Sequence, residues 1–339
     1  MILNPILGKR YKARCRFHDS LHSGTIRARE QIVEGVLASA APRERPCLCG
    51  GADEKLLSLV DRWGLPVFSM LCMDCGLIRL SPVHEDDVYE TIYKNYYWPL
   101  CLASQDLTRS RFERSVRRAR PSTCGLAKWI DLKGKRLLEL GCSYGAGLHC
   151  LRETGASLVG YDYDERFLDM GRQLTGLDLR SGGLDSAIAD GERYDVVVLR
   201  HVFEHFSDPV VQGSRLRSLL DSGGVLFVEV PGVLSEDRWR PDPLLGFDYF
   251  HPFHYSLMTL RMVMSLAGLS LIKGDERVYS LWREDQNMNI LKPDCHEGAR
   301  ILGFIRRMEQ KRRWNAMSFP LLSRIPWRRE NRETEENSL

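Results

Sequence analysis

One segment, LLELGCSYGAGLH at residues 137–149, constrains the fold of this chain more than any other. Its apolar start predicts a buried strand, its glycines predict a tight turn, and its end predicts the first turn of a helix. Gly141, Gly145 and Gly147 carry no Cβ atom, so a ligand can approach the backbone of the turn closely. The segment therefore predicts a strand–turn–helix unit that binds a ligand.

Two acidic residues beside this turn restrict the choice of ligand. Glu139 precedes the turn, and Asp162 ends the next predicted strand, SLVGYD. A dinucleotide-binding turn has the pattern G-x-G-x-x-G and places a pyrophosphate at the helix N-terminus, where the Glu139 carboxylate would repel it. A nucleoside with a cationic centre and no phosphate suits the turn better. S-adenosylmethionine meets this description, with Glu139 near its charged amino acid end and Asp162 accepting hydrogen bonds from its ribose.

Further buried strands are expected in YDVVVLRHVFEHFSDP (194–209) and GGVLFVEVPG (223–232), because each is an apolar run that leads into polar residues. The donor site is expected to use the turn and the polar ends of the strands. The predicted donor-binding residues are Glu139, Gly141, Cys142, Ser143, Gly145, Asp162, Tyr163, Asp185 and His201.

In combination, the segments LELGC, HVFEH and EVPG resemble class I S-adenosylmethionine-dependent methyltransferases. The likeness is greatest to the branch with an N-terminal cysteine module, which includes sugar and surface-polysaccharide methyltransferases, and it covers residues 46–293. It implies an α/β fold with a doubly wound, mostly parallel, seven-stranded Rossmann-like sheet. An antiparallel hairpin at GLSLIKGDERV and NMNILKP is expected to close the sheet. Ser143 departs from the family pattern, which more commonly has glycine there.

Four of the ten cysteines form two pairs roughly twenty residues apart, Cys47 with Cys49 and Cys72 with Cys75. Their sequences, C-L-C-G and C-M-D-C-G, are close to the knuckles of a zinc ribbon. A segment of fewer than about 40 residues seldom folds on hydrophobic burial alone, so a structural zinc ion is expected here. The C-x-C spacing is one residue shorter than usual, and four reduced cysteines in a small apolar module are the alternative.

Histidines follow two of the predicted strands. His201 and His205 come after YDVVVLR, and His251 and His254 lie in YFHPFHYS, beyond the GGVLFVEVPG strand. Methyl transfer to a hydroxyl group requires a base for the hydroxyl proton, and histidine is largely neutral at pH 7. The predicted catalytic residues are therefore His251, His205 and His254.

Two resemblances bear on the type of methyl transfer. YFHPFHYS is similar to a segment of sugar C-methyltransferases in which a glutamate precedes the residue that matches His251. Phe250 stands in place of that glutamate, which favours O-methylation. In quinone-pathway O-methyltransferases, the residues that match His201, Glu204 and His205 hold a divalent cation. A catalytic cation at these three residues is therefore a further hypothesis.

Two short motifs point to other enzymes. Gly141, Ser143 and Gly145 spell the G-x-S-x-G nucleophile elbow of α/β-hydrolases, but that elbow usually follows several strands, which the upstream sequence does not predict. The pattern H-x-x-E-H at 201–205 matches an inverted zinc-protease signature, which requires both histidines on one helix. His201 directly follows an apolar run and is expected to end a strand. Both alternatives are disfavoured.

The chain divides into five predicted parts. These are an N-terminal arm with one helix (1–45), the zinc-binding cysteine module (46–82), an aromatic-rich helical linker or lid (83–125), the methyltransferase domain (126–293) and a basic, aromatic tail with a disordered end (294–339). Tyr93, Tyr96 and Tyr97 lie at helical spacing in the linker, either as packing residues or as a lid on the substrate. The tail, with Trp314 and Trp327 among arginines, suits contact with an anionic membrane or a lipid-linked substrate, or a helix docked on the core.

The composition agrees with a globular enzyme. A chain of 339 residues with 43% hydrophobic content can bury a substantial core. Its net charge of +3, without a dominant basic run in the central domain, disfavours a nucleic-acid partner. The N-terminus has the wrong order for a secretory signal, and no segment approaches the roughly 20 apolar residues that cross a bilayer. Ten cysteines without an export signal indicate a cytoplasmic protein with reduced or metal-bound thiols.

Three functions fit these features. The favoured one is O-methylation of a saccharide or sugar-containing glycan precursor. The second is methylation of a non-sugar small molecule such as a phenol, a quinone or a natural product. The third is a non-catalytic binding protein that retains the fold. The oligomeric state is not predicted.

Overall fold

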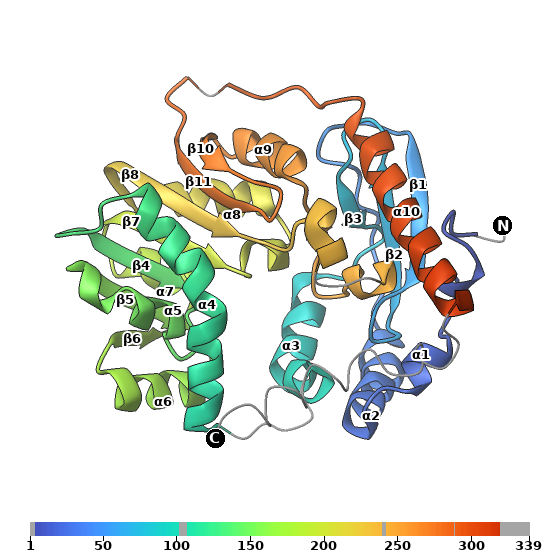
Figure 1. Ribbon diagram of the computed structural model, residues 1–339, viewed down its shortest axis with the longest axis horizontal. Coiled ribbons are helices and arrows are strands. Elements are labelled where there is room, and N and C mark those ends of the chain that lie inside the picture. Colours follow the sequence, from blue (N-terminus) through green and yellow to red (C-terminus); the bar gives the residue numbers. More distant parts are fainter. Residues whose placement is uncertain (1–3, 102–106, 239–241, 288, 319–339) are drawn as a thin grey trace.

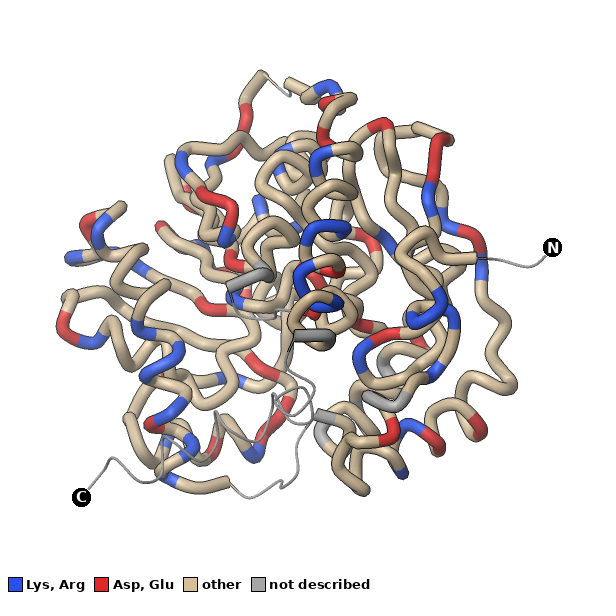
Figure 2. Tube along the Cα trace, turned by 45° about the vertical axis from the view of Figure 1, so that its right-hand side comes forward, with Lys and Arg blue, Asp and Glu red and all other residues tan. Residues whose placement is uncertain are grey.

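The computed structural model describes residues 4–101, 107–238, 242–287 and 289–318 (Figure 1). The strands of these residues form two sheets. The larger sheet has the strand order β10-β11-β8-β7-β4-β5-β6, and the smaller one has the order β1-β2-β3-β9. Basic and acidic residues are interspersed along the whole described trace, around the larger sheet as well as the smaller one (Figure 2).

The larger sheet is mostly parallel. Strands β6, β5, β4, β7 and β8 run parallel to one another, whereas β11 runs antiparallel to both β8 and β10. This order confirms the predicted α/β fold with a mostly parallel seven-stranded sheet, and an antiparallel hairpin of β10 and β11 closes it. The strands are β4 (Arg136–Leu140), β5 (Ser157–Asp162), β6 (Asp178–Ser181), β7 (Tyr194–Arg200), β8 (Leu220–Glu229), β10 (Leu269–Gly274) and β11 (Tyr279–Glu284).

Side chains of successive residues in the central strands enter two different cores. Leu137 of β4 packs with α4 (Arg109–Trp129), α5 (Ala146–Cys150) and α6 (Glu165–Thr175) on one face. Its neighbour Leu138 packs with α7 (Leu184–Ala189), α8 (Pro209–Arg217) and α9 (Leu257–Leu266) on the other. Because both faces are covered, the strands read as continuous apolar runs. The sheet is doubly wound.

The smaller sheet combines distant parts of the chain. Strands β1 (Glu54–Val60), β2 (Pro66–Cys72) and β3 (Ile78–Leu80) follow one another, but β9 (Phe253–His254) comes from beyond β8 and pairs with β3. The N-terminal residues pack around this sheet through η1 (Lys9–Tyr11), α1 (Arg16–Asp19), α2 (Ser23–Gln31) and a π-helix, η2 (Ile32–Leu37). The aromatic-rich linker forms α3 (Asp86–Cys101), which contacts α2.

Short 3-10 helices complete the connections. They are η3 (Arg152–Thr154), η4 (Phe203–His205), η5 (Val233–Arg238) and η6 (Pro243–Gly246). Among the described residues, no helix is long and apolar enough to cross a membrane.

The first half of the tail is a helix, α10 (Glu297–Ser318), which lies across the smaller sheet (Figure 1). Ile301 and Ile305 are buried against Leu57 of β1 and Leu71 of β2. The docked-helix alternative is thus correct for this part. Residues 319–339, including Trp327, lie outside the described residues, so membrane contact stays a prediction.

One predicted strand is wrong. Within the described residues, NMNILKP forms no strand, and the second strand of the closing hairpin is YSLWRE, β11. Ile290 is 65% exposed, whereas Leu281 and Trp282 of β11 are buried. The backbone amides of Asn287 and Asn289 instead donate to the Asp285 carboxylate, which forms a turn.

We expect Ile305→Ala to lower the free energy of unfolding by about 2–5 kcal/mol, because a buried side chain is truncated and a cavity remains. Trp314→Ala on the same helix should change it by less than about 0.5 kcal/mol, since Trp314 is 68% exposed. Urea denaturation of both full-length variants measures the difference. Equal losses would show that α10 does not dock through its buried face.

Candidate functional site

The predicted donor turn lies where open α/β sheets bind their ligands. Strand order reverses at β4, with β5 and β6 on one side and β7 and β8 on the other. Ligands of such sheets bind at the carboxyl ends of the strands beside this reversal. The turn at residues 141–145 follows β4, and the segment 201–206 follows β7, so both lie at this place.

The conformation of the turn requires residues with little or no side chain. Gly141, Ser143 and Gly145 have φ angles of 69°, 51° and 70°, in the left-handed region. A Cβ atom on Gly141 would lie only 2.4 Å from Cγ2 of Val202. The amides of Gly141 and Cys142 donate to the carbonyl of Tyr161. The turn is therefore fixed against β5 and closely covered by the segment after β7.

Asp162 is oriented by two backbone amides. Its Oδ2 accepts a hydrogen bond of 2.8 Å from Ser143, and its Oδ1 accepts one of 2.9 Å from Asp164. Burial raises the pKa of Asp162, while these hydrogen bonds act in the opposite direction. Each carboxylate oxygen can accept a further hydrogen bond. The geometry therefore suits the predicted contact with ribose hydroxyls.

Glu139 is buried, at 3% exposure, and paired with Arg200. Its Oε1 accepts a hydrogen bond of 2.8 Å from Arg200 Nε, whereas Oε2 has no hydrogen-bond partner among the described residues. Burial raises the pKa of Glu139 and the Arg200 charge opposes this rise. Arg200 was not among the predicted site residues, although its position at the end of β7, next to His201, was a usable signal.

His201 lies between two carboxylates. Its Nδ1 is 3.3 Å from Glu204 Oε1 and its Nε2 is 3.5 Å from Glu229 Oε1, with the side chain 58% exposed. Loss of hydration favours the neutral ring, but the two carboxylates outweigh this and raise the pKa of His201 to about 10. A cationic imidazole neither accepts a proton nor binds a metal. The raised pKa of His201 therefore agrees with its predicted role in donor binding and argues against a role as the base that accepts the hydroxyl proton.

The other predicted donor-binding residues lie in different environments. Cys142 is buried, with its sulfur against Gly160. Tyr163 is 76% exposed, with its hydroxyl beside Gly183. Asp185 is exposed on α7 and forms an ion pair with Arg215 of α8. Its part in donor binding stays a prediction.

The three histidines predicted to be catalytic meet in one cluster. The ring centroids of His205 and His251 are 4.9 Å apart, and those of His251 and His254 are 5.8 Å apart. His205 Nδ1 is 2.8 Å from the carbonyl oxygen of Phe250, which fixes the ring. His251 Nε2 lies 3.9 Å from Asp248 Oδ2. Burial lowers the pKa of His251 well below its usual value, more than Asp248 raises it, so the ring is neutral at pH 7.

Two of the three predicted substrate-contacting tyrosines of α3 border this cluster. Tyr93 and Tyr97 stack on each other with centroids 4.4 Å apart. Tyr93 meets the His205 ring at 6.2 Å, and Tyr97 meets Phe250 edge-on at 5.0 Å. Tyr96 packs against the core beneath α2 and α3. Aromatic rings and histidines thus surround the same space.

A metal-compatible group overlaps with the histidine cluster. Ligand atoms of Glu204, His205 and His251 all lie within 4.8 Å of one another. Glu204 is 2% exposed, and apart from the ion-pair contact of its Oε1 with His201, its oxygens have no hydrogen-bond partner among the described residues. The grouping differs from the hypothesis drawn from the sequence, because His251 stands in place of His201.

The four cysteines of the predicted module converge. Cys47 Sγ is 3.5 Å from the sulfurs of Cys75 and Cys49, and the Cys49 and Cys72 sulfurs are 3.6 Å apart. A tetrahedral zinc site with Zn–S bonds of about 2.3 Å has sulfurs about 3.8 Å apart, so the cluster fits the ion. A hydrogen bond from Cys75 lowers the pKa of Cys47 to about 5, which favours a thiolate. Amides of Gly51 and Leu77 donate to Cys49 and Cys75 sulfurs.

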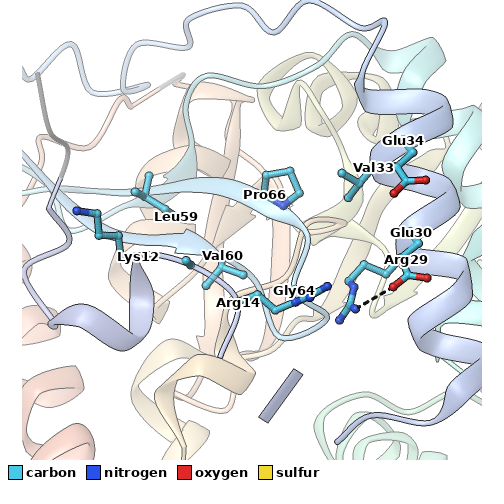
Figure 3. Close-up of a pocket in the computed structure, with 11 residues that line it drawn as sticks. Lys12, Arg14, Arg29, Glu30, Val33, Glu34, Leu59, Val60, Gly64 and Pro66 are labelled. Atoms are coloured by element: carbon cyan, nitrogen blue, oxygen red, sulfur yellow. Dashed lines mark ion pairs between the residues drawn. The ribbon is translucent and has the colours of Figure 1, made fainter. Parts of the chain in front are cut away.

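A cavity of about 430 Å³ lies apart from these residues. It is lined by the N-terminal segment, α2, η2 and the hairpin of β1 and β2, with Lys12, Arg14 and Arg29 among its basic groups and Glu30 and Glu34 among its acidic ones (Figure 3). None of the predicted site residues lines it.

A family model matches the part of the chain that contains the predicted donor turn. Residues 110–273 match a family model described as a methyltransferase domain. This range includes the predicted donor turn after β4 and the segment 201–206 after β7. The match covers 164 of the 339 residues, just under half of the chain. The match begins in α4 and ends in β10, so it covers the strands of the larger sheet except β11, the strand that runs antiparallel to both of its neighbours.

Curated relatives of this chain are named for activities on different molecules. The chain is 28% identical over 169 residues to a tRNA U34 carboxymethyltransferase of Campylobacter hominis, covering 48% of this chain and 58% of the relative. It is 34% identical over 102 residues to a ubiquinone biosynthesis O-methyltransferase of Cereibacter sphaeroides, covering 29% and 41%. The chain thus spans about two fifths to three fifths of the length of these relatives.

Among solved structures, magnesium protoporphyrin IX methyltransferase of Synechocystis with bound SAH shares 18% identity. The alignment covers 58% of this chain and 97% of that one, with a TM-score of 0.40. A putative methyltransferase of Haloferax volcanii in complex with the Trm112 activator gives 21% identity, 49% and 76% coverage and a TM-score of 0.40. The fold assignment therefore rests on the strand order and the family match.

We expect Asp162→Ala to weaken binding of S-adenosylhomocysteine by roughly 1–3 kcal/mol, because the ribose loses a charge-assisted acceptor. Asp162→Asn, which keeps one acceptor oxygen, should lose less affinity for S-adenosylhomocysteine than Asp162→Ala does. Asp169→Ala, on the exposed side of α6, is the matched control. Isothermal titration calorimetry measures all three, and unchanged affinity in Asp162→Ala would refute the ribose contact.

Proposed function

We propose that this protein is an O-methyltransferase that transfers the methyl group of S-adenosylmethionine to a hydroxyl of a saccharide or sugar-containing glycan precursor. The main support is the pair of His205 and His251 beside the stacked Tyr93 and Tyr97, next to the donor turn. The contact of Val202 with Gly141 keeps this cluster adjacent to the donor site.

S-adenosylmethionine supplies the methyl group on a sulfonium, which is already a good leaving group. The protein has to align the acceptor hydroxyl with the methyl carbon, exclude water and remove the hydroxyl proton. His251 is the proposed base, since its buried, neutral ring can accept that proton. The Asp248 carboxylate, 3.9 Å away, would then stabilise the imidazolium.

Because the pKa of His251 is lowered, turnover should persist below pH 6.5, where an ordinary histidine loses its basicity.

Tyr93 and Tyr97 are proposed to contact the acceptor. Tyr93 is 43% exposed although it is an aromatic residue in contact with His205, so its ring borders both the cluster and solvent. Flat aromatic faces pack against the apolar faces of sugar rings and leave the hydroxyl groups free for hydrogen bonding. This supports a saccharide acceptor.

A phenol or quinone precursor is the second candidate. Two observations favour it: the O-methyltransferases of ubiquinone biosynthesis among the relatives, and the Glu204, His205 and His251 group. A divalent cation held by these residues would bind and polarise an acceptor oxygen. Assay of sugar and phenol panels, with and without added Mg²⁺ or Mn²⁺ and EDTA, distinguishes the two. No binding of donor to the protein would favour a non-catalytic role.

We also propose that Cys47, Cys49, Cys72 and Cys75 hold a structural zinc ion. Three distances between these sulfurs are 3.5–3.6 Å, close to the roughly 3.8 Å expected in a tetrahedral zinc site, and all four sulfurs lie within 4.8 Å of one another. The cysteines Cys47, Cys72 and Cys75 also belong to the same buried cluster as Phe203 and Tyr255, near the proposed base. Zinc would therefore stabilise both the smaller sheet and its junction with the methyltransferase domain.

We expect His251→Ala to reduce turnover by about 10²- to 10⁴-fold, since a positioned base is lost. Affinity for S-adenosylhomocysteine should be retained. His296→Ala, at an exposed histidine before α10, should leave both unchanged. Single-turnover rates on the best acceptor of the panel provide the measurement, and an active His251→Ala would place the base elsewhere.

We expect the purified protein to contain one equivalent of zinc and Cys72→Ser to lose it. Its thermal unfolding midpoint should fall with the metal, because binding free energy of a structural zinc contributes to folding. Cys295→Ser, at an exposed cysteine, is the control. Plasma mass spectrometry and calorimetry measure the two effects. A zinc-free wild-type protein of full stability would favour four reduced thiols.

A further inference from the structure

The cavity of about 430 Å³ beside α2 is separate from the site described above. It lies between the segment 12–14, the end of α2 with the start of η2, and the hairpin of β1 and β2 (Figure 3). None of the residues that line it belongs to the proposed donor, acceptor or zinc sites. A ligand in this cavity would therefore occupy a second site.

A buried guanidinium borders the cavity. Arg29 is 3% exposed, yet it forms a single hydrogen bond with the described residues, from Nη1 to the carbonyl oxygen of His18 at 3.3 Å. Its Nη2 lies 3.7 Å from Glu30 Oε1, which is too far for a hydrogen bond. A guanidinium has five N–H donors, so four of them have no acceptor among these residues. Unused donors on a buried charge are costly, which favours an anionic acceptor in the cavity.

Close packing fixes the position of this guanidinium. Gly64, in the turn between β1 and β2, has a φ angle of 84°. A Cβ atom at this position would lie 3.2 Å from Arg29 Cδ and 3.3 Å from its Nη1. His18, which accepts the hydrogen bond from Arg29, also contacts the carbonyl oxygen of Asp61 through Nε2 at 2.8 Å. The turn and α1 therefore hold Arg29 in place before any ligand binds.

The charge of the lining indicates a ligand with one negative charge. Lys12, Arg14 and Arg29 stand against Glu30 and Glu34, which leaves one excess positive charge. A single carboxylate neutralises this excess and can accept two parallel hydrogen bonds from a guanidinium. A phosphate ester carries about −1.5 to −2 at pH 7 and would leave the cavity negative.

The rest of the lining is largely apolar. Val33, Leu59, Val60 and Pro66 form this part of the wall. Small-molecule sites combine apolar walls with a few polar groups that orient the ligand, in volumes of about 300–1,000 Å³. The cavity therefore suits an anion with an apolar body better than a bare inorganic ion.

We propose that this cavity binds a small organic monocarboxylate. Arg29 anchors the carboxylate, and Val33, Leu59 and Pro66 contact the apolar body. The site does not depend on the methyltransferase function, because it shares no residue with the donor or acceptor sites.

The test uses benzoate as the probe, with benzamide and inorganic phosphate for comparison. Benzamide keeps the shape without the charge, and phosphate is an anion without an apolar body. Calorimetry on the full-length protein should give one benzoate site, with the other two compounds at least about tenfold weaker. The benzoate affinity should be the same when S-adenosylhomocysteine is present in excess.

Two variants locate the site. Arg29→Met should weaken benzoate by at least about tenfold, since the charge-assisted contact is lost. Ala13→Trp, at an exposed position of the lining, should do the same by occupying the cavity. Arg27→Met is the matched control, because Arg27 is an exposed arginine of the same helix, and it should leave the affinity unchanged.

Hydrogen exchange of the wild-type protein gives an independent readout. Benzoate should slow amide exchange in residues 29–34 and in the turn 61–65, because both border the cavity. Protection confined to other parts of the chain would overturn the proposal.

Other results would also contradict it. Benzoate that does not bind, or that S-adenosylhomocysteine displaces, would rule out a separate carboxylate site. Phosphate that binds as tightly as benzoate would refute the monocarboxylate. Full affinity in Ala13→Trp would place the probe elsewhere, and this variant decides alone if Arg29→Met does not fold.

Discussion

The contact between Gly141 and Val202 is the constraint on which the rest of the site depends. Because position 141 has no side chain, the segment after β7 can cover the donor turn at van der Waals distance. This brings His201, Glu204 and His205 to the carboxyl end of β4. A larger residue at position 141 would separate the turn from the histidines, and the two halves of the site would no longer face a common space.

From there a series of contacts leads to the smaller sheet. His205 is held by the carbonyl of Phe250, and the following residues form β9, which pairs with β3. Arg62 pairs with Asp248 at 2.7 Å, and the Tyr249 amide donates to Asp61. Burial acts to raise the pKa of Asp248, but the Arg62 charge, together with other nearby groups and a hydrogen bond from the Phe250 amide, outweighs burial and lowers this pKa. The proposed base is therefore carried by a segment that both sheets hold in place.

The sequence predicted the elements whose pattern is local. Continuous apolar runs identified β4, β5, β7 and β8, and the glycines of the turn located the reversal of strand order. Long-range pairs were not predictable in this way. From the sequence, Arg200 would be expected to point into solvent at the end of its strand. The fold shows instead that its side chain occupies the space that the missing side chain of Gly147 leaves. The two-residue β9 has too little periodicity to be recognised, and its partner lies more than 170 residues earlier.

The cysteine cluster is better described as part of the main core than as a separate module. Cys72 and Cys75 pack in one buried cluster with Phe203, which lies between Val202 and Glu204. Helix α10 also packs closely against the turn that follows Cys75. A Cβ atom on Gly76 would lie 2.5 Å from Cγ of Glu297, so only glycine fits at this position without displacing the helix. Such close packing transmits displacements instead of absorbing them. Opening of the cysteine cluster would therefore shift the segment that carries Glu204 and His205, so the proposed zinc ion would be physically connected to the proposed acceptor site.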